Sequence, residues 1–272
     1  MSDNIENLLH TLANVRTYDL EHVRYPGMPG FDPVKPALHY FLYRHHENYY
    51  IPGKNGPRTS SSGLMVMTDQ SGTHIDALCH QAADMKLFDG TQVTPDVETP
   101  WGFTKLDASQ MPVFIKRGVL VDVAKFHSDP LPERHSITLK EFQDTLSREG
   151  VKLTRDCVVL VRTGYGRFWN DPHKYEMAAG VSKEVSLFLQ DKCIAVGADN
   201  LAWDVPEERD PETKSMLPGH LYLIAKKGIY IIENINLEGL SRDGVYEFVF
   251  LGFPPKFKGA TGSPFRPVAL AP

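Results

Sequence analysis

Short apolar runs separated by polar segments are the feature that most limits how this chain can fold. Six runs have the length and composition of β-strands: 64–67, 118–123, 157–162, 194–197, 229–233 and 246–253. None approaches the 18 uninterrupted apolar residues of a membrane-spanning helix. Helical patterns lie between several of the runs, so the sequence predicts a mixed α/β fold.

Three segments have the periodicity of amphipathic helices. Residues 138–150 begin with the capping box of Thr138 and Glu141 and end at a glycine, and residues 182–190 form a second candidate. The segment 1–16 has apolar residues at helical spacing, which predicts a helix packed on the body or on a partner subunit. No repeat, linker or change in composition divides the chain, so we expect residues 1–272 to form a single domain.

Composition narrows the class of partner. The chain has 272 residues, of which 42% are hydrophobic and 23% charged, so it can bury a large core without disulfides. Its net charge is −5, without runs of like charge, which argues against nucleic acid and membrane surfaces and favours a small-molecule partner. Three separated cysteines and an acidic N-terminus without a signal-peptide pattern indicate a cytoplasmic location.

The segment 17–62 is rich in proline, glycine, histidine and tyrosine. This composition predicts extended chain and loops. A long irregular segment of this kind often lines a pocket.

The densest polar segment, 68–81, directly follows the apolar run 64–67. In extended chain His74 and Asp76 point to the same face, about 7 Å apart at the backbone, from where both reach one ion. If a helix follows, His80 stays on the same side as Asp76 at i,i+4. Gly72 permits a bend that would turn the Gln70 amide oxygen inward, which makes Gln70 a further candidate metal ligand.

A structural interpretation competes with this one. A histidine and an aspartate this close at a strand end are more often a hydrogen-bonded pair than metal ligands, and spacing alone favours that account. A single histidine such as His80 is likewise more often a packing residue. The concentration of these groups within seven residues is what supports a functional site.

A second polar region spans residues 199–220, and its part 204–219 is long enough to form a lid. After it, Glu233 interrupts a strongly apolar strand. A buried carboxylate there costs several kcal/mol unless it is paired, hydrogen-bonded or bound to a metal. The alternative is that Glu233 lies at an exposed strand end.

These residues resemble the signature of the cyclase family of metal-dependent hydrolases, which includes bacterial kynurenine formamidase, isatin hydrolase and a trans-dienelactone hydrolase. The family reads His-x-Gly-Thr-His-x-Asp-x-Pro-x-His, and residues 70–80 reproduce it with Gln70 in place of the first histidine and Leu78 in place of proline. Further similarity runs almost the whole length of the chain, at 19–20, 26–29, 160–165, 197–199, 220, 228–234 and 259–264.

The resemblance implies a swivelling β/β/α fold and a homo-oligomer, a dimer or a tetramer. It places metal ligands at His74, Asp76, His220 and Glu233, and a proton-transferring histidine at His80. The family's first histidine is a ligand in two-zinc formamidases, and at that position Gln70 offers only an amide oxygen, a poorer zinc donor. We therefore expect one divalent ion per subunit, zinc or manganese, and the sequence leaves a second ion open.

The activity implied is hydrolysis of a cyclic amide or lactone, as in isatin hydrolase or the dienelactone hydrolase. The ion would polarise the carbonyl and lower the pKa of a water toward ~7, and His80 would carry the proton to the leaving nitrogen or oxygen. Four aromatic residues are candidates for the substrate pocket: Phe31, Tyr165, Trp169 and Trp203. The alternatives are an aryl formamidase of the kynurenine type and a non-catalytic module that binds a metal or small molecule.

Overall fold

The computed structural model describes all residues except 1, 32–34, 36 and 55. Within these residues the main sheet has nine strands in the order β1-β15-β13-β7-β9-β11-β12-β4-β14. Their bounds are β1 Arg16–Asp19, β4 His74–Asp76, β7 Phe114–Val121, β9 Val158–Val161, β11 Ala195–Ala198, β12 Tyr230–Glu233, β13 Glu247–Gly252, β14 Gly262–Pro264 and β15 Val268–Ala271. The central strands β7, β9, β11 and β12 are parallel, and antiparallel strands flank them on both sides.

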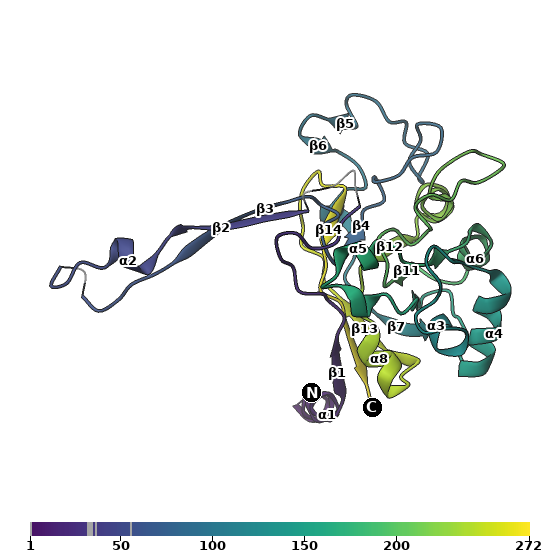
Figure 1. Cartoon of the computed structure of the whole chain (residues 1–272), viewed down its shortest axis with the longest axis horizontal. Helices are drawn as coiled ribbons and strands as arrows, with labels where there is room; N and C mark the ends of the chain where they lie inside the picture. The colour runs from purple at the N-terminus through teal and green to yellow at the C-terminus, as the bar shows by residue number, and fades with distance from the viewer. Residues whose placement is uncertain (1, 32–34, 36, 55) are drawn as a thin grey trace.

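Helices and smaller two-stranded sheets lie outside this main sheet (Figure 1). The helices are α1 Ser2–Ala13, α2 His46–Tyr49, α3 Val123–Phe126, α4 Leu139–Glu149, α5 Pro172–Tyr175, α6 Lys183–Leu189, α7 Pro218–His220 and α8 Glu238–Asp243. Short 3₁₀ turns span Ala108–Gln110 and Gly166–Phe168, and a π-helical turn spans Leu221–Ala225. The two-stranded sheets pair β2 Leu38–Arg44 with β3 Ser62–Met67, β5 Glu98–Thr99 with β6 Gly102–Phe103, and β8 Ser136–Ile137 with β10 Gly180–Val181.

The core lies on both faces of the parallel strands. Every residue of β9 and β11 is buried, as expected for parallel strands covered on two sides. One core cluster joins Val161 and Val196 to Phe142 of α4 and Leu189 of α6. The other packs β4, β12 and the C-terminal strands together on the opposite face.

The predicted mixed α/β class is confirmed, and each of the six apolar runs overlaps a strand. Helix α4 has the predicted capping box, in which the Thr138 hydroxyl accepts from the Glu141 backbone and the Glu141 carboxylate accepts from the Thr138 backbone. Ser182 caps α6 in a similar way. These local signals were sufficient to predict the starts of α4 and α6, because they depend on residues only three or four positions apart.

Two expectations need correction. The segment 17–62 was expected to be extended chain and loops, but its run 38–43 lies in a regular strand, β2, which pairs with β3 in a long hairpin that extends away from the body (Figure 1). The segment after Asp76 is a turn, closed by the His80 N–H donating to the Ala77 carbonyl, rather than the helix considered above. Helix α1 exists, but its apolar side chains Ile5, Leu9 and Leu12 are exposed on this chain.

Candidate metal centre

Neighbouring antiparallel strands bring the two halves of the site together. In the ladder between β4 and β12, Glu233 lies directly opposite His74. Asp76 points to the same face of β4 as His74, because side chains two apart on a strand share a face. All three side chains are buried, so Glu233 does not lie at an exposed strand end.

His220 reaches the same point from α7. Its Nε2 lies 3.6 Å from Asp76 Oδ2 and 3.3 Å from Glu233 Oε1. His74 Nε2 lies 3.7 Å from Asp76 Oδ1 and 3.2 Å from Glu233 Oε2. Two imidazole nitrogens and two carboxylates, drawn from three separate elements, therefore face one small volume.

Several atoms that face this volume have no hydrogen-bond partner among the described residues. They are His74 Nε2, both carboxylate oxygens of Asp76, and Glu233 Oε1. A buried polar atom left unpaired costs about 1–3 kcal/mol, and more when it carries charge. Imidazole nitrogens and carboxylate oxygens are donors for divalent zinc and manganese, so this set of residues fits a cation.

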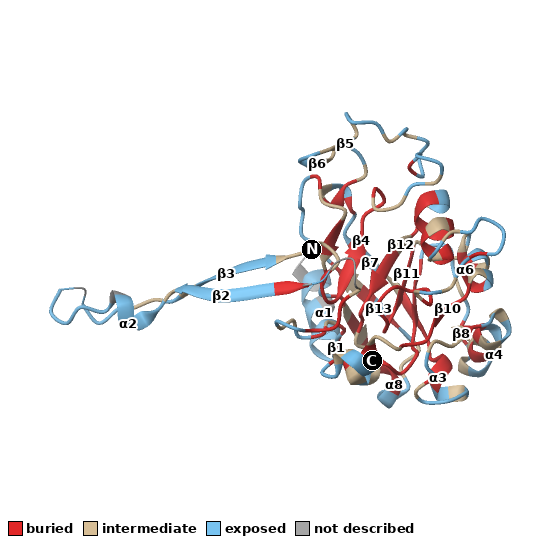
Figure 2. Ribbon diagram, turned by 45° about the horizontal axis from the view of Figure 1, so that its top comes forward, coloured by how far each residue is buried: buried red, intermediate tan, exposed pale blue. Residues whose placement is uncertain are grey.

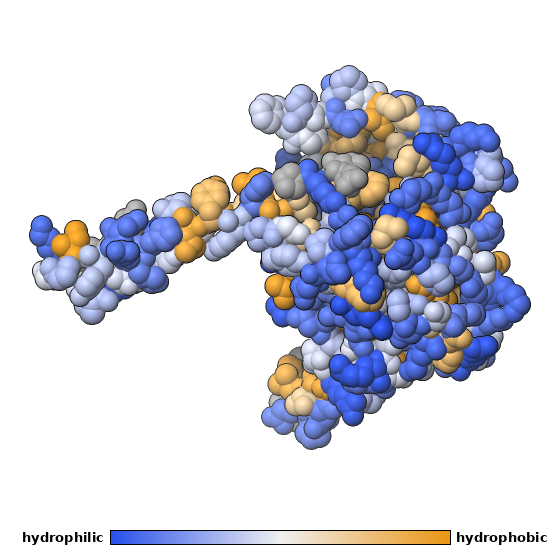
Figure 3. Space-filling model, in the orientation of Figure 1, coloured by the Kyte–Doolittle hydropathy of each residue, from blue (hydrophilic) through white to orange (hydrophobic). Residues whose placement is uncertain are grey.

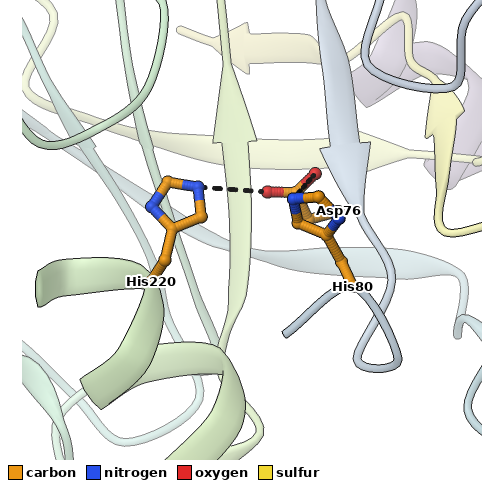
Figure 4. A group of neighbouring side chains, drawn as sticks. All are labelled: Asp76, His80 and His220. Atoms are coloured by element: carbon orange, nitrogen blue, oxygen red, sulfur yellow. Dashed lines mark ion pairs between the residues drawn. The ribbon is translucent and has the colours of Figure 1, made fainter. Parts of the chain in front are cut away.

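His80 lies at the edge of the cluster. The turn after β4 places its Nε2 3.9 Å from Asp76 Oδ1, and its side chain stays 27% exposed. Its ring centre is 6.2 Å from that of His220 (Figure 4). This partly open position suits a group that exchanges protons with a substrate.

Both buried histidines are oriented by hydrogen bonds on their other ring nitrogen. His220 Nδ1 lies 2.9 Å from Asp204 Oδ2, and Asp204 also accepts from the backbone N–H groups of Gly219 and His220. His74 Nδ1 lies 2.8 Å from the Gly72 carbonyl. Donation from Nδ1 leaves Nε2 of each ring as the free lone pair, which is the usual arrangement of a metal-ligating histidine.

Asn234 links His74 to the deeper core. Its Nδ2 donates to the same Gly72 carbonyl, and its Oδ1 accepts from the Tyr175 hydroxyl. The Thr73 hydroxyl donates to the Asn234 carbonyl. Our sequence interpretation gave no role to Asp204 or Asn234, because each acts through a partner that is distant in sequence.

The charges of the cluster are strongly coupled. Burial alone would raise the pKa of Glu233, but the nearby charges of His220 and His74 outweigh burial and lower that pKa. Burial also opposes a charge on the two histidines, yet the neighbouring carboxylates raise the pKa of both His74 and His220. The pocket therefore attracts positive charge.

A cavity of about 190 Å³ opens beside the cluster. His74, His80, His220 and Glu233 contribute to its wall, and Phe31, Leu201 and Leu217 supply apolar surface. Gln70 also lines it, with its Nε2 donating to the Thr261 hydroxyl at 3.1 Å. Such a small, largely apolar cavity suits a small substrate.

Of the four aromatic candidates for the pocket, only Phe31 is among the residues that line this cavity. Trp203 is fully buried in the main core, where its Nε1 donates to Ser186 Oγ. Tyr165 and Trp169 pack in a third cluster, and the Trp169 Nε1 donates to the Val23 carbonyl.

The two ends of the segment 204–219 are joined by a hydrogen bond. The Gly219 backbone N–H, in α7, donates to the Asp204 carboxylate.

Comparison with known proteins identifies the family. Residues 18–205 match the family model described as "Putative cyclase", which is more than half of the chain. The chain belongs to the cyclase family. This membership agrees with the signature found at residues 70–80. No curated protein matches this cyclase-family chain.

Solved structures share the fold over nearly the whole length. A crystal structure of a novel cyclase has 27% identity and a TM-score of 0.83, and covers 100% of this chain and 92% of its own. Isatin hydrolase A from Labrenzia aggregata has 21% identity and a TM-score of 0.72, covering 98% of this chain and 99% of its own. An isatin hydrolase bound to thioisatinate, a product analogue, has 20% identity and a TM-score of 0.73, covering 100% and 98%.

The sequence analysis also concerned disulfides and membrane-spanning helices. In the structure the three cysteines are buried and are not paired in a disulfide. Among the described residues of this cyclase-family protein, no helix has the length and apolar character needed to span a bilayer.

Proposed function

We propose that this protein is a metal-dependent hydrolase that opens a small cyclic amide or lactone. The observation that carries the proposal is the group of buried donor atoms without hydrogen-bond partners, next to a partly exposed histidine and a small cavity. A scaffold protein has no reason to gather unpaired ionisable groups in this way. A hydrolase gains from them both a cation site and a proton-transfer group.

The cation would be held by His74, Asp76, His220 and Glu233, whose donor atoms suit Zn²⁺ or Mn²⁺. When bound, it would act as a Lewis acid toward the substrate carbonyl and lower the pKa of a water. Asp204 and the Gly72 carbonyl keep Nε2 of the two histidines turned toward the site. Gln70 adds no negative charge to these four proposed ligands. Because a second ion would need further charged or imidazole donors, this favours one ion per chain.

His80 is the residue to which we assign proton transfer. It would accept a proton from the attacking water and return it to the nitrogen or oxygen that leaves when the ring opens. An imidazole suits this role near neutral pH. The His80 Nε2 lies 3.9 Å from Asp76 Oδ1, so the ring is next to the proposed cation site.

The cavity supports a small, flat substrate. Phe31, Leu201 and Leu217 would bind the ring by apolar contact, and its carbonyl would face the ionisable cluster. Structures of isatin hydrolases, one of them bound to the product analogue thioisatinate, superimpose on nearly all of this chain. We therefore place a cyclic amide of the isatin type first among the substrate classes, and a lactone second.

The test is a substrate panel run with enzyme loaded with zinc or manganese. The panel contains a cyclic amide such as isatin, an unsaturated lactone and an aryl formamide, and ring opening is followed by absorbance. Ring opening that depends on the metal supports the proposal. Turnover of the formamide alone would show that the protein is a formamidase and would overturn the proposal of ring opening. Metal uptake without turnover of any substrate would indicate a non-catalytic binding module.

A further inference from the structure

Gln70 contributes a neutral amide to the wall of the cavity beside the candidate metal centre. The strands that carry three of the proposed ligands, β4 and β12, lie in the buried interior of the molecule (Figure 2). Gln70 lies just before β4, and its side chain is half-buried. Because an amide has both donor and acceptor atoms, its orientation decides which group of a ligand it can bind.

Hydrogen bonds fix the orientation of the Gln70 amide. Asp69 Oδ2 accepts from the Thr261 backbone N–H at 2.8 Å and from the Thr261 hydroxyl at 3.1 Å. A hydroxyl has one proton to donate, so toward Gln70 it presents only lone pairs. Gln70 therefore donates to Thr261, through Nε2 at 3.1 Å. The other amide atom, Oε1, is an acceptor to which none of the residues that the structure describes donates.

A close approach to β14 places this amide beside the proposed metal ligands. Gly262 lies directly opposite Asp76 in the ladder between β4 and β14. Directly opposed residues of an antiparallel pair share one face, so a side chain at Gly262 would lie on the same face as that of Asp76. A Cβ at Gly262 would come within 2.7 Å of Gln70 Nε2. The Gln70 amide thus fills the space of the side chain that Gly262 lacks.

The cavity offers a small apolar ring matching surface. Phe31, Leu201 and Leu217 supply the apolar part of its wall. The face of the body seen in Figure 3 is mostly hydrophilic, with small and scattered hydrophobic patches. A ring that enters the cavity therefore meets apolar side chains, the ionisable cluster and the Gln70 amide together.

We infer that Gln70 Oε1 accepts a hydrogen bond from the ring N–H of a cyclic amide whose carbonyl faces the cation. The inference rests on the proposed function, which places that carbonyl at the cluster of ionisable groups. A small ring holds its amide cis, so the N–H and the carbonyl oxygen point to the same side of the molecule. This geometry matches an acceptor that lies beside Asp76.

Gln70 is thereby a specificity residue that favours cyclic amides over the two other substrate classes. A lactone has a ring oxygen in place of the N–H, so it would face Oε1 with a second acceptor and leave Oε1 unpaired. A linear formamide prefers the trans form, in which the N–H points away from the carbonyl oxygen. Neither class pairs with both the cation and Gln70 in its favoured geometry.

The test is the binding of three probes of one bicyclic shape. Oxindole, 2-indanone and benzofuran-2-one have N–H, CH₂ and O, respectively, beside the carbonyl. Affinities are measured by calorimetry on zinc-loaded His80→Ala, which keeps the four proposed ligands but lacks the proton-transfer group, so that the probes stay intact. Into this background we place Gln70→Leu, which removes the acceptor, or Thr261→Val, which removes the hydroxyl that holds the amide. Gln81→Leu makes the same change at another glutamine of the cavity wall.

With Gln70 present, oxindole should bind about 10-fold or more tightly than 2-indanone, and benzofuran-2-one should bind no better than 2-indanone. Gln70→Leu should bring oxindole and 2-indanone to within about 2-fold of each other, with the zinc content unchanged. Thr261→Val should reduce the preference, and it decides if Gln70→Leu does not fold. Gln81→Leu should keep the preference.

Equal binding of the three probes in the presence of Gln70 overturns the inference, as does a preference for oxindole that survives in Gln70→Leu. Loss of zinc from Gln70→Leu also overturns it, because residue 70 would then bind the cation. Failure of the proposed function has a different result. If oxindole binds through Gln70 but the protein with His80 opens no ring, the N–H site stands and the hydrolase does not.

Discussion

The carboxylate of Asp204 holds the imidazole of His220 at 2.9 Å, while its second oxygen accepts from the Gly219 backbone. Asp204 is fully buried, and burial raises its pKa even though His220 and the backbone donors oppose that change. This carboxylate therefore acts on the candidate metal centre through His220 and does not face the centre itself. It fixes both the ring orientation and the nitrogen that carries the proton.

The variant Asp204→Asn should weaken zinc affinity by 10- to 100-fold, because the amide keeps the volume but loses the charge that orients His220. Competition with a chromogenic chelator measures the affinity. The matched control is Asp210→Asn in the same loop, where the carboxylate instead binds Lys183, Thr213 and Tyr222. Equal zinc affinity in the wild type and Asp204→Asn would show that His220 needs no such support.

Removal of His74 should abolish stable metal binding. His74→Ala deletes one of the two imidazoles that face the carboxylates of Asp76 and Glu233. Elemental analysis of the purified protein should give about one zinc or manganese per wild-type chain and almost none in the variant. His173→Ala, which changes an exposed histidine of α5, serves as the control. Full metal content in His74→Ala would rule out the proposed ligand set.

His80 should matter for turnover and not for metal content. Because its ring lies at the cavity edge, 3.9 Å from Asp76, His80→Ala removes the proton-transfer group and leaves the four proposed ligands intact. We expect kcat to fall by about 10²- to 10⁴-fold, with the metal stoichiometry unchanged. If His80→Ala has activity close to that of the wild type, another group or solvent carries out the proton transfer.

Gln70 is expected to keep the number of ions at one. Its side chain lines the cavity and its amide nitrogen donates to Thr261, so it offers no anionic or imidazole donor to a second ion. Gln70→His should raise zinc content from about one to about two per chain. Gln81→His, at another position on the cavity wall, is the matched control. Two ions in the wild type would contradict this account.

His22 should make the fold sensitive to acid. Burial lowers the pKa of His22 from 6.5 to about 4, against a hydrogen bond with the Ile235 backbone, and its ring stacks on Trp169 at 4.6 Å. Between these two pH values the unfolded chain binds a proton that the folded chain does not, so stability falls as the pH falls from 6.5 to 4. The loss attributable to His22 is about 3 kcal/mol.

Urea unfolding at pH 7, 5.5 and 4.5 measures this effect. His22→Phe keeps a ring against Trp169 but cannot take up a proton, so its free energy of unfolding should depend less steeply on pH than that of the wild type. The expected difference in slope lies on the acid side of pH 6.5. Identical slopes for the two proteins would mean that His22 is protonated as easily when folded as when unfolded.

Much of the fold was predictable because its signals are local. The apolar runs at 157–162 and 194–197 overlap buried parallel strands, and the Thr138 capping box marks the start of α4. Strand β3 was predicted at 64–67, but strand β2 was not, because proline, glycine and histidine are frequent in residues 17–62 and obscure the apolar run 38–43. No local pattern predicts that the run 38–43 pairs with β3 in a hairpin that extends away from the body.

The sequence by itself determined which residue types are available for chemistry, since His74, Asp76 and His80 lie within seven positions and repeat a family signature. Only the tertiary structure decided that Glu233 faces His74 across a strand pair and that His220 joins them from a helix. The structure also showed that Asp204 orients His220. Trp203, which was predicted to line the pocket, lies in the core instead. The physical reason is that spacing fixes neighbours along one element, whereas burial and strand register decide which distant side chains share one volume.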